Sequence, residues 1–557
     1  MTDTKALLVL LLSALLGRFI TPPLLSGGAT RVLNARWFPL LIGLVTAVFM
    51  TWMWGGLDQV AVIHDEASYL LQAKIYAGGH WAAPGRPLPE FFEQYHVFVT
   101  PILTSKYPPG HAMLLVPGIW LGLPGLMPIL LVAFCGALVF EVARRLSNPY
   151  IGLFTWFLWM TAPGVMDFEP SYLSETSTSA LWMLGWYAML RWLEDDRPKW
   201  LAWLAISIGL GFLSRPVTVV AFSIPVAVVV LRRIAKRNAW RELQVPLGLG
   251  FIFVALWMLW SQRTTGNPLV APYGLYSRVY FPDDVMGFGL TGKHPLRALN
   301  PDMALFNEFV KITHKDYTLA SLPTNLWERV VAIAANMWAS RAMLLPLTAL
   351  ALITTSAPIW FALATTVLLV LAYLCFGHAP QWTVYYVEIQ PVLAFASAVA
   401  WWRIASLFAN RKLAWPLRDV PAVVPGAVVA MFVSGLLLFP YTTRMVDSVR
   451  SYKVEEVAYH RDFRDLLRLV PGEHIMVFIR YAPNHSPHES LVTNEPDLNA
   501  ARVWTVYDRG ADNIRLIRLA PTRTPYLFDD EHRALVQLDS TGAPRMDRVI
   551  REPGKRY

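Results

Sequence analysis

Long apolar blocks are the feature of this sequence that most limits its fold. They run for about 15–22 residues, the length that an α-helix needs to cross the ~30 Å hydrocarbon layer of a membrane. The composition agrees, because 55% of the residues are hydrophobic and only 16% are charged. A soluble domain carries about 25% charged residues. We therefore expect a polytopic α-helical membrane protein and exclude a water-soluble enzyme.

About eleven blocks can be distinguished as membrane-spanning helices. They cover 37–54, 127–142, 151–165, 174–190, 200–213, 217–231, 243–260, 343–353, 359–376, 389–407 and 420–439. Basic residues gather in the loops at 144–145, 191–199, 232–241 and 411–418, which share one side if the spans alternate. Positive loops mark the cytoplasmic side, so the net charge of +9 reflects membrane orientation, and nucleic acid is not expected as a partner.

The first apolar block, 6–25, has two interpretations. Arg18, Pro22 and Pro23 interrupt it, and no small-residue cleavage site follows it as in a signal peptide. We expect residues 1–36 to hold an interfacial or re-entrant helix, with an extra membrane span as the alternative.

Beyond this segment the chain divides into a membrane domain and an outer domain. Residues 37–440 carry the spans and two long outer loops, 57–126 and 262–342. Residues 441–557 open with a helical pattern over 445–470. Strand-like runs follow at 474–480, 502–507, 525–528 and 534–538. These patterns predict a small C-terminal α/β domain on the extracytoplasmic side.

An acidic pair, Asp65 and Glu66, stands in the outer loop just beyond the first span. Asp65 could simply cap a helix over 66–77, which Gly78 and Gly79 would end. Alternatively, partial desolvation at the membrane face would raise the pKa of this carboxylate, which would then act as a general base toward a hydroxyl.

The same loop ends in Lys106-Tyr107-Pro108-Pro109-Gly110, directly before a further apolar stretch. The two prolines alone make a rigid bend that needs no further purpose. A lysine beside that bend, at the depth of the lipid headgroups, could instead bind a lipid phosphate.

Three more candidates lie at the outer ends of spans. Glu175 enters a span, as a helix cap together with Ser174 or as a functional acid. Arg215, before Pro216, could snorkel to the interface or bind phosphate in bidentate fashion. Tyr385 belongs to an aromatic turn that suits a membrane belt as well as it suits sugar stacking.

In this order the motifs resemble a known family. They are the acidic pair 65–66, the motif 106–110, Ala-Arg-Arg-Leu at 143–146, Ser171 to Glu175, and Gly-Leu-Gly-Phe-Leu-Ser-Arg at 209–215. They are similar to motifs of the GT-C integral-membrane glycosyltransferases, in the branch of the protein O-mannosyltransferases and the lipid A aminoarabinose transferase. The similarity covers roughly residues 37–400, and the stretch 478–497 resembles the tail module of bacterial members.

This resemblance implies a sugar donor carried on a polyprenyl phosphate. The sugar would pass, with inversion, to a hydroxyl of a glycan, lipid or protein acceptor at the outer face of a bacterial inner membrane. Asp65 would be the base, and Lys106 and Arg215 would hold the phosphate. The other residues expected at the substrate are Glu66, Tyr107, Glu175 and Tyr385.

A cofactor is not required by this chemistry, but a divalent metal stays a candidate. His485, His488 and Glu489 are close enough in sequence to suggest ligands, although such a loop is more often a hydrogen-bonding turn. The alternative function is a multi-span transporter or lipid flippase. Transporters often show internal repeats, and none is visible here.

Overall fold

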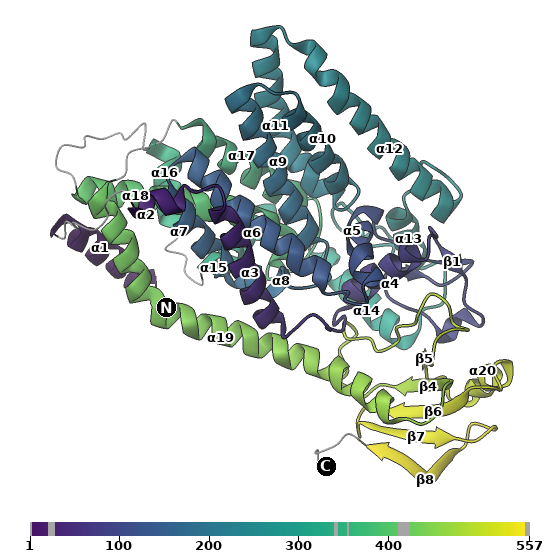
Figure 1. Cartoon of the computed structure of the whole chain (residues 1–557). Helices are drawn as coiled ribbons and strands as arrows, with labels where there is room; N and C mark the ends of the chain where they lie inside the picture. The colour runs from purple at the N-terminus through teal and green to yellow at the C-terminus, as the bar shows by residue number, and fades with distance from the viewer. Residues whose placement is uncertain (1–2, 20–27, 339–343, 354–355, 410–423, 552–557) are drawn as a thin grey trace.

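The computed structural model in Figure 1 describes residues 3–19, 28–338, 344–353, 356–409 and 424–551. A large helical body is joined to a small sheet domain by one long helix. The expected helical membrane domain and the small C-terminal sheet are therefore confirmed. The predicted basic loop 411–418 and residues 20–25 of the first apolar block lie outside the described residues.

Each predicted span coincides with helical structure in its described part; residue 343 and residues 420–423 of two spans lie outside the described residues. The helices are α3 (Phe38–Trp54), α6 (Leu126–Leu146), α7 (Pro149–Met160), α9 (Glu175–Asp195), α10 (Lys199–Phe212), α11 (Pro216–Arg237), α12 (Gln244–Thr265), α16 (Leu344–Ile353), α17 (Ala357–Tyr373), α18 (Gln390–Ala409) and α19 (Pro425–Leu469). The predicted span 151–165 is interrupted, because α7 ends at Met160 and a short helix, α8 (Pro163–Phe168), follows. Pro163 disfavours helical backbone at Ala162, which is extended.

In the described ranges, five helices are both long and apolar enough to cross a membrane: α6, α11, α12, α18 and α19, where α12 and α18 include the 3₁₀ turns η2 (Trp240–Leu243) and η4 (Thr383–Ile389) before them. Helices α3, α10 and α17 are apolar but shorter. The chain is thus a multi-pass membrane protein, and the count of eleven spans is not established.

Helix α1 (Asp3–Phe19) packs against α18 and α19, and α2 (Gly28–Leu33) follows it in the chain. A Cβ at Gly17 would lie 2.2 Å from the carbonyl oxygen of Gly426. Only glycine allows the backbones of α1 and α19 to approach so closely, as at small-residue contacts between membrane helices.

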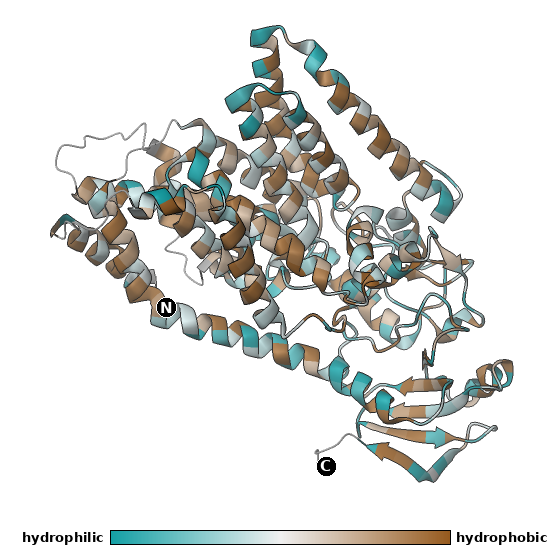
Figure 2. Cartoon of the chain, in the orientation of Figure 1, coloured by the Kyte–Doolittle hydropathy of each residue, from teal (hydrophilic) through white to brown (hydrophobic). Residues whose placement is uncertain are grey.

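Helix α19 joins the two domains without a linker. The predicted boundary after residue 440 falls inside it, and Pro440 is accommodated within the helix. Hydrophobic residues predominate in its first part and hydrophilic ones become frequent further on (Figure 2). The last membrane block and the predicted outer helix 445–470 are therefore one continuous helix.

The C-terminal domain contains five strands and a short helix. They are β4 (Ile475–Arg480), β5 (Val503–Tyr507), β6 (Thr524–Asp529), β7 (Ala534–Leu538), β8 (Pro544–Arg551) and α20 (Asn513–Leu519), with a 3₁₀ turn η5 (Gly510–Asp512). The strand order is β5-β4-β6-β7-β8, in which β4 is parallel to β5 and β6 and the later pairs are antiparallel. Sequence patterning missed β8, since four of its eight residues are charged.

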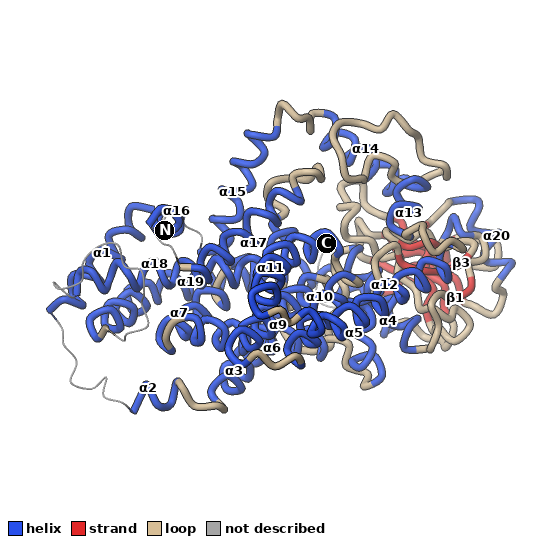
Figure 3. Tube along the Cα trace, turned by 90° about the horizontal axis from the view of Figure 1, so that it is seen from above, coloured by secondary structure: helices blue, strands red, loops and turns tan. Residues whose placement is uncertain are grey.

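This sheet is held between α19 and the first outer loop. Alternate residues of a strand face opposite sides, so Val477 packs with Phe463 of α19, while Phe478 packs with Phe91 and Phe92 of the outer loop. Figure 3 shows the strands gathered at one end of the helical body. The C-terminal domain therefore docks directly on the membrane domain.

The outer loops have their own structure. The first holds α4 (His64–Ala77), β1 (Ala83–Pro84), η1 (Pro89–Phe91), β2 (Val97–Phe98), β3 (Ile102–Ser105) and α5 (Pro109–Trp120), and the second holds α13 (Pro272–Tyr280), α14 (Pro301–Lys315) and α15 (Leu322–Trp338). Strands β1, β3 and β2 form a small antiparallel sheet.

Candidate active site

A cavity of about 540 Å³ lies where the outer loops, the turn η4 and the C-terminal domain meet. It is lined by six of the seven residues singled out from the sequence: Asp65, Glu66, Lys106, Tyr107, Glu175 and Tyr385. The seventh, Arg215, forms an ion pair with Glu175. Segments far apart in the sequence thus bring the predicted site residues to one place.

Asp65 presents its carboxylate to the cavity and does not cap a helix. Helix α4 begins at His64 with Ile63 as its N-cap, so Asp65 lies in the first turn. Its Oδ1 accepts a hydrogen bond from the Tyr107 hydroxyl. Its Oδ2 lies 2.8 Å from Nδ1 of His64 and 3.8 Å from Nε2 of His96. The capping interpretation of Asp65 is therefore wrong.

The pKa of Asp65 is shifted in the direction opposite to the expected one. Burial alone would raise it, but the nearby imidazoles of His96 and His64 and the hydrogen bonds from His64 and Tyr107 outweigh burial. The pKa of Asp65 therefore lies well below its ordinary value. The carboxylate is ionised at neutral pH, the form in which it can accept a proton.

The carboxylate of Glu66 holds the start of helix α4 in place. This carboxylate accepts hydrogen bonds from the backbone N–H groups of Val62 at 2.8 Å, Ile63 at 3.4 Å and Tyr172 at 2.9 Å. Burial nevertheless raises the pKa of Glu66. These contacts fix the start of α4, and with it the position of Asp65, against the turn before α9.

Lys106 is a buried cation at the cavity wall. Its backbone N–H donates to the carbonyl of His96 at 2.8 Å, which extends the β2–β3 pairing to this residue. Its Nζ lies 3.2 Å from Oδ2 of Asp284 and 4.3 Å from the centre of the Tyr273 ring. A carboxylate and an aromatic face thus hold the charge in place.

The motif 106–110 is packed directly against the turn that carries Arg215. The N–H of Gly110 donates to the carbonyl of Leu213 at 2.7 Å. A Cβ at Gly110 would lie 2.7 Å from Oγ of Ser214 and 2.8 Å from the carbonyl carbon of Leu213. The glycine of this motif is therefore required by close packing, and it couples the positions of Lys106 and Arg215.

Arg215 is buried behind the cavity wall in a network of charges. It pairs with Glu175, lies 3.5 Å from Oε1 of Glu388, and donates to the hydroxyl of Tyr373 at 3.1 Å. Its guanidinium is 5.9 Å from the centre of the Tyr385 ring. Two carboxylates around one guanidinium make this a buried, fully engaged cation.

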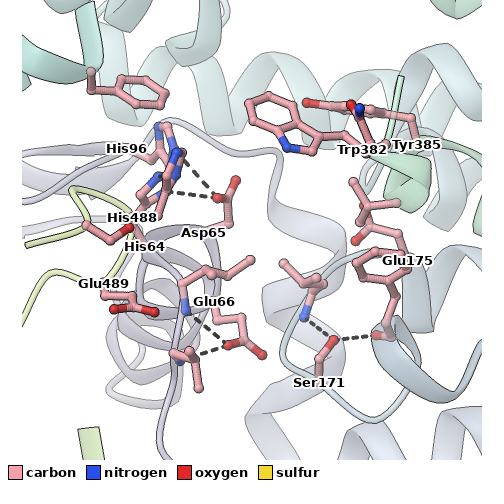
Figure 4. Close-up of a pocket in the computed structure, with 18 of the residues that line it drawn as sticks. His64, Asp65, Glu66, His96, Ser171, Glu175, Trp382, Tyr385, His488 and Glu489 are labelled. Carbon is pink, nitrogen blue, oxygen red and sulfur yellow. Dashed lines mark hydrogen bonds and ion pairs between the residues drawn. The ribbon is translucent and has the colours of Figure 1, made fainter. Parts of the chain in front are cut away.

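Three histidines surround Asp65, and sequence reasoning did not assign them there. Figure 4 shows His64, His96 and His488 grouped beside Asp65, with Trp382 and Tyr385 across the cavity. Burial lowers the pKa of His96 well below its ordinary value and that of His488 to about 4, so both are neutral at pH 7. The position of His64 directly before Asp65 was the available signal.

The donor atoms that converge in the described part of the chain differ from the expected metal ligands. One atom from each of His64, Asp65 and His96 lies within 4.8 Å of the others. In the loop around residues 485–489, His485 instead stacks on Tyr481 with ring centres 3.9 Å apart. Two imidazoles and a carboxylate are ligands that Zn²⁺ accepts.

Comparisons with known proteins bear on the fold of this chain. The model of a family described as dolichyl-phosphate-mannose-protein mannosyltransferase matches residues 125–260. No curated protein matches the sequence. The crystal structure of ArnT from Cupriavidus metallidurans bound to undecaprenyl phosphate is similar over 89% of this chain and 94% of its own, with 14% identity and a TM-score of 0.50.

Two further solved structures match less well. The oligosaccharyltransferase of Archaeoglobus fulgidus in the apo form has 12% identity and a TM-score of 0.39, over 88% of this chain and 69% of its own. The arabinosyltransferase EmbB of Mycobacterium smegmatis has 12% identity and a TM-score of 0.39, over 82% and 44%. The fold shared with ArnT confirms the resemblance to the GT-C integral-membrane glycosyltransferases.

Proposed function

We propose that the protein is a membrane glycosyltransferase that moves a sugar from a polyprenyl-phosphate donor to a hydroxyl of a glycan, lipid or protein, with inversion. The proposal rests on one observation, which is that a base and a cation lie together at one cavity. The carboxylate of Asp65 is hydrogen-bonded to Tyr107, the neighbour of the buried cation Lys106, and all three line the same cavity.

The chemistry needs one base and no protonating acid. The acceptor hydroxyl gives its proton to Asp65, and its oxygen attacks the anomeric carbon from the face opposite the phosphate. The bond from that carbon to the phosphate oxygen breaks with both electrons on the oxygen, and polyprenyl phosphate leaves. A weak base is sufficient, because the proton becomes acidic only as the new bond forms. Positive charge at the leaving phosphate stabilises the transition state.

Lys106 and Arg215 are the proposed phosphate-binding residues. The donor phosphate would compete with Asp284 for Lys106 and with Glu175 for Arg215, the pairs that hold these cations in the structure. The carboxylate beside each cation compensates the buried positive charge, and the negative charge of the donor phosphate can take the place of that carboxylate. Apolar cavity residues such as Phe306 and Phe376 offer contact to the donor lipid.

We place the cavity on the periplasmic side of a bacterial inner membrane. Helix α11 begins directly after Arg215 and carries Lys236 and Arg237 in its last turn. Helix α6 likewise carries Arg144 and Arg145 in its last turn. Basic helix ends mark the cytoplasmic side, so the opposite end of α11, where the cavity lies, faces outward.

Transfer can be tested with purified protein in lipid nanodiscs. Undecaprenyl phosphate carrying radiolabelled hexoses or pentoses would be supplied one at a time, with membranes of the source cell as acceptor. Label in a product that no longer extracts as lipid-linked sugar supports the proposal. Label that stays on undecaprenyl phosphate with every sugar, together with solute or lipid counterflow in liposomes, supports the transporter or flippase.

A divalent metal is a separate proposal for the same cavity. The donor set of His64, Asp65 and His96 suits Zn²⁺ or Mn²⁺. The direct 2.8 Å contact between Nδ1 of His64 and Oδ2 of Asp65 is the alternative to a metal, because both arrangements use these two residues. Metal analysis of the purified protein decides: one bound ion that His96→Ala removes supports the metal, and no ion in the wild-type protein refutes it.

A further inference from the structure

The C-terminal domain supplies side chains to the cavity wall. Its loop 481–502, between β4 and β5, brings Ser486, His488 and Glu489 into the lining. In Figure 4 His488 lies beside His64, on the side of the cavity that holds Asp65. The transfer chemistry above makes no use of this loop.

Direct contacts hold the loop on the membrane domain. The guanidinium of Arg86 donates to the carbonyls of Glu495 at 2.5 Å and Pro496 at 3.0 Å. The Nζ of Lys74, on the helix that carries Asp65, lies 2.5 Å from Oε1 of Glu495. Because Arg86 is largely buried and uses both terminal nitrogens, the register of the loop against the outer loop is fixed.

A chain of three polar side chains leads from this loop to Asp65. Nδ1 of His488 lies 2.9 Å from Nε2 of His64. The other ring nitrogen of His64, Nδ1, lies 2.8 Å from Oδ2 of Asp65. An imidazole has one polar atom on each side, so His64 contacts His488 and Asp65 at the same time.

The His64 ring cannot readily turn away from this arrangement. It is buried and stacks on Tyr95, with ring centres 4.8 Å apart. When His488 donates from Nδ1, Nε2 of His64 is the acceptor, and a proton on Nδ1 of His64 faces Asp65. In that arrangement His488 holds His64 in the form that supports the carboxylate.

We infer that His488 is a positioning residue for transfer: through His64 it fixes the carboxylate of Asp65, so the C-terminal domain completes the active site. The inference rests on the proposed function. Fixing a reacting group through a second, hydrogen-bonded group is the arrangement that activated sites use. An Asp65 carboxylate free to rotate would be misplaced for the acceptor hydroxyl, at a cost of about 10- to 100-fold in rate.

The identity of the contacting atom gives a sharp test. Asn places its amide close to the position of Nδ1, whereas Gln places it close to Nε2. Since the contact uses Nδ1, His488→Asn should keep kcat within about threefold of the wild type, while H488Q and H488A should lower it about 10- to 100-fold. The KM for acceptor should stay unchanged in all three, with a radiolabelled undecaprenyl-phosphate sugar that the wild type uses as the probe.

His485→Ala is the matched control, since His485 lies in the same loop but contacts Asp302, at 3.8 Å, and Tyr481. It should leave kcat unchanged. Combining H488A with D65N should give the rate of D65N alone, because His488 acts only through Asp65.

The inference is overturned if H488N and H488Q are equally impaired, if H488A changes the acceptor KM and not kcat, or if the H488A and D65N effects multiply. Full turnover in H488A with loss in D65N would overturn it and leave the proposed function intact. Absence of transfer by the wild type would instead remove the proposed function.

Discussion

Replacing Asp65 by Asn isolates the proposed base with little change of structure. An Asn side chain keeps an oxygen that can accept the Tyr107 hydrogen bond and has the same shape. It replaces Oδ2, the atom beside His64, by an amide nitrogen that cannot take a proton. The substitution therefore removes the base and leaves the cavity wall in place.

The size of the effect follows from what is lost. A general base contributes about 10²- to 10⁴-fold to a rate, which is about 2.7–5.4 kcal/mol of activation free energy. The lost contact with His64 costs about 1 kcal/mol of folding stability, too little to unfold the protein. We expect kcat to fall by that factor, the donor KM to stay within about threefold, and the melting temperature to change by a few degrees.

The assay is the transfer of label from an undecaprenyl-phosphate sugar in nanodiscs, with binding of undecaprenyl phosphate measured in parallel. Because the pKa of Asp65 lies well below 3.8, wild-type kcat/KM should show no acidic limb from this group above about pH 4. Wild-type turnover in D65N with intact binding would refute the assignment of Asp65 as base.

Three further outcomes are expected. Lys106→Met should weaken undecaprenyl phosphate binding about 10- to 100-fold through loss of a charge-assisted contact. The double variant K106M/D284N is the control, because it does not leave Asp284 unpaired. If the double variant binds undecaprenyl phosphate as tightly as the wild type, Lys106 does not form the phosphate site. Gly110→Ala should destabilise the protein by about 1–3 kcal/mol through contact with Ser214 and reduce transfer, whereas an unchanged melting temperature would mean that the turn yields freely. Burial raises the pKa of Glu93 to about 7, although Arg297 opposes this shift. The native state therefore keeps a proton that the unfolded chain loses above about pH 4.5, and the free energy of unfolding should fall as pH rises from about 4.5 to 7, by at most about 3 kcal/mol. The variant E93Q should flatten that fall in a series of denaturation measurements.

The sequence predicts the positions of the apolar helices because each is a local pattern. Helix α6, for example, spans Leu126–Leu146 where hydropathy places 127–142. The sequence does not predict that one helix continues through two regions of different composition. The charged stretch after Pro440 reads as a separate outer helix, but packing of residues such as Phe463 against the sheet extends α19 through both regions.

The sequence names residues that the structure brings together, but it does not predict their electrostatics. Asp65 and Lys106 stand in short motifs, so each could be named, and the cavity brings them together. The pKa of Asp65 depends on His96, and its neighbour His64 contacts His488, which comes from the far end of the chain. No local pattern reports a contact between segments so distant in sequence, and for that reason the expected direction of the pKa shift was wrong.

The central claim is that this cavity consumes a polyprenyl-phosphate sugar. The most direct measurement is mass spectrometry of lipid-linked sugars in source cells that lack the gene, with the wild-type gene or the D65N variant restored on a plasmid. One polyprenyl-phosphate sugar should accumulate in the deletion strain and with D65N, and should return to its normal level with the wild type. An unchanged pool of lipid-linked sugars in all strains, with altered solute uptake, would contradict the claim.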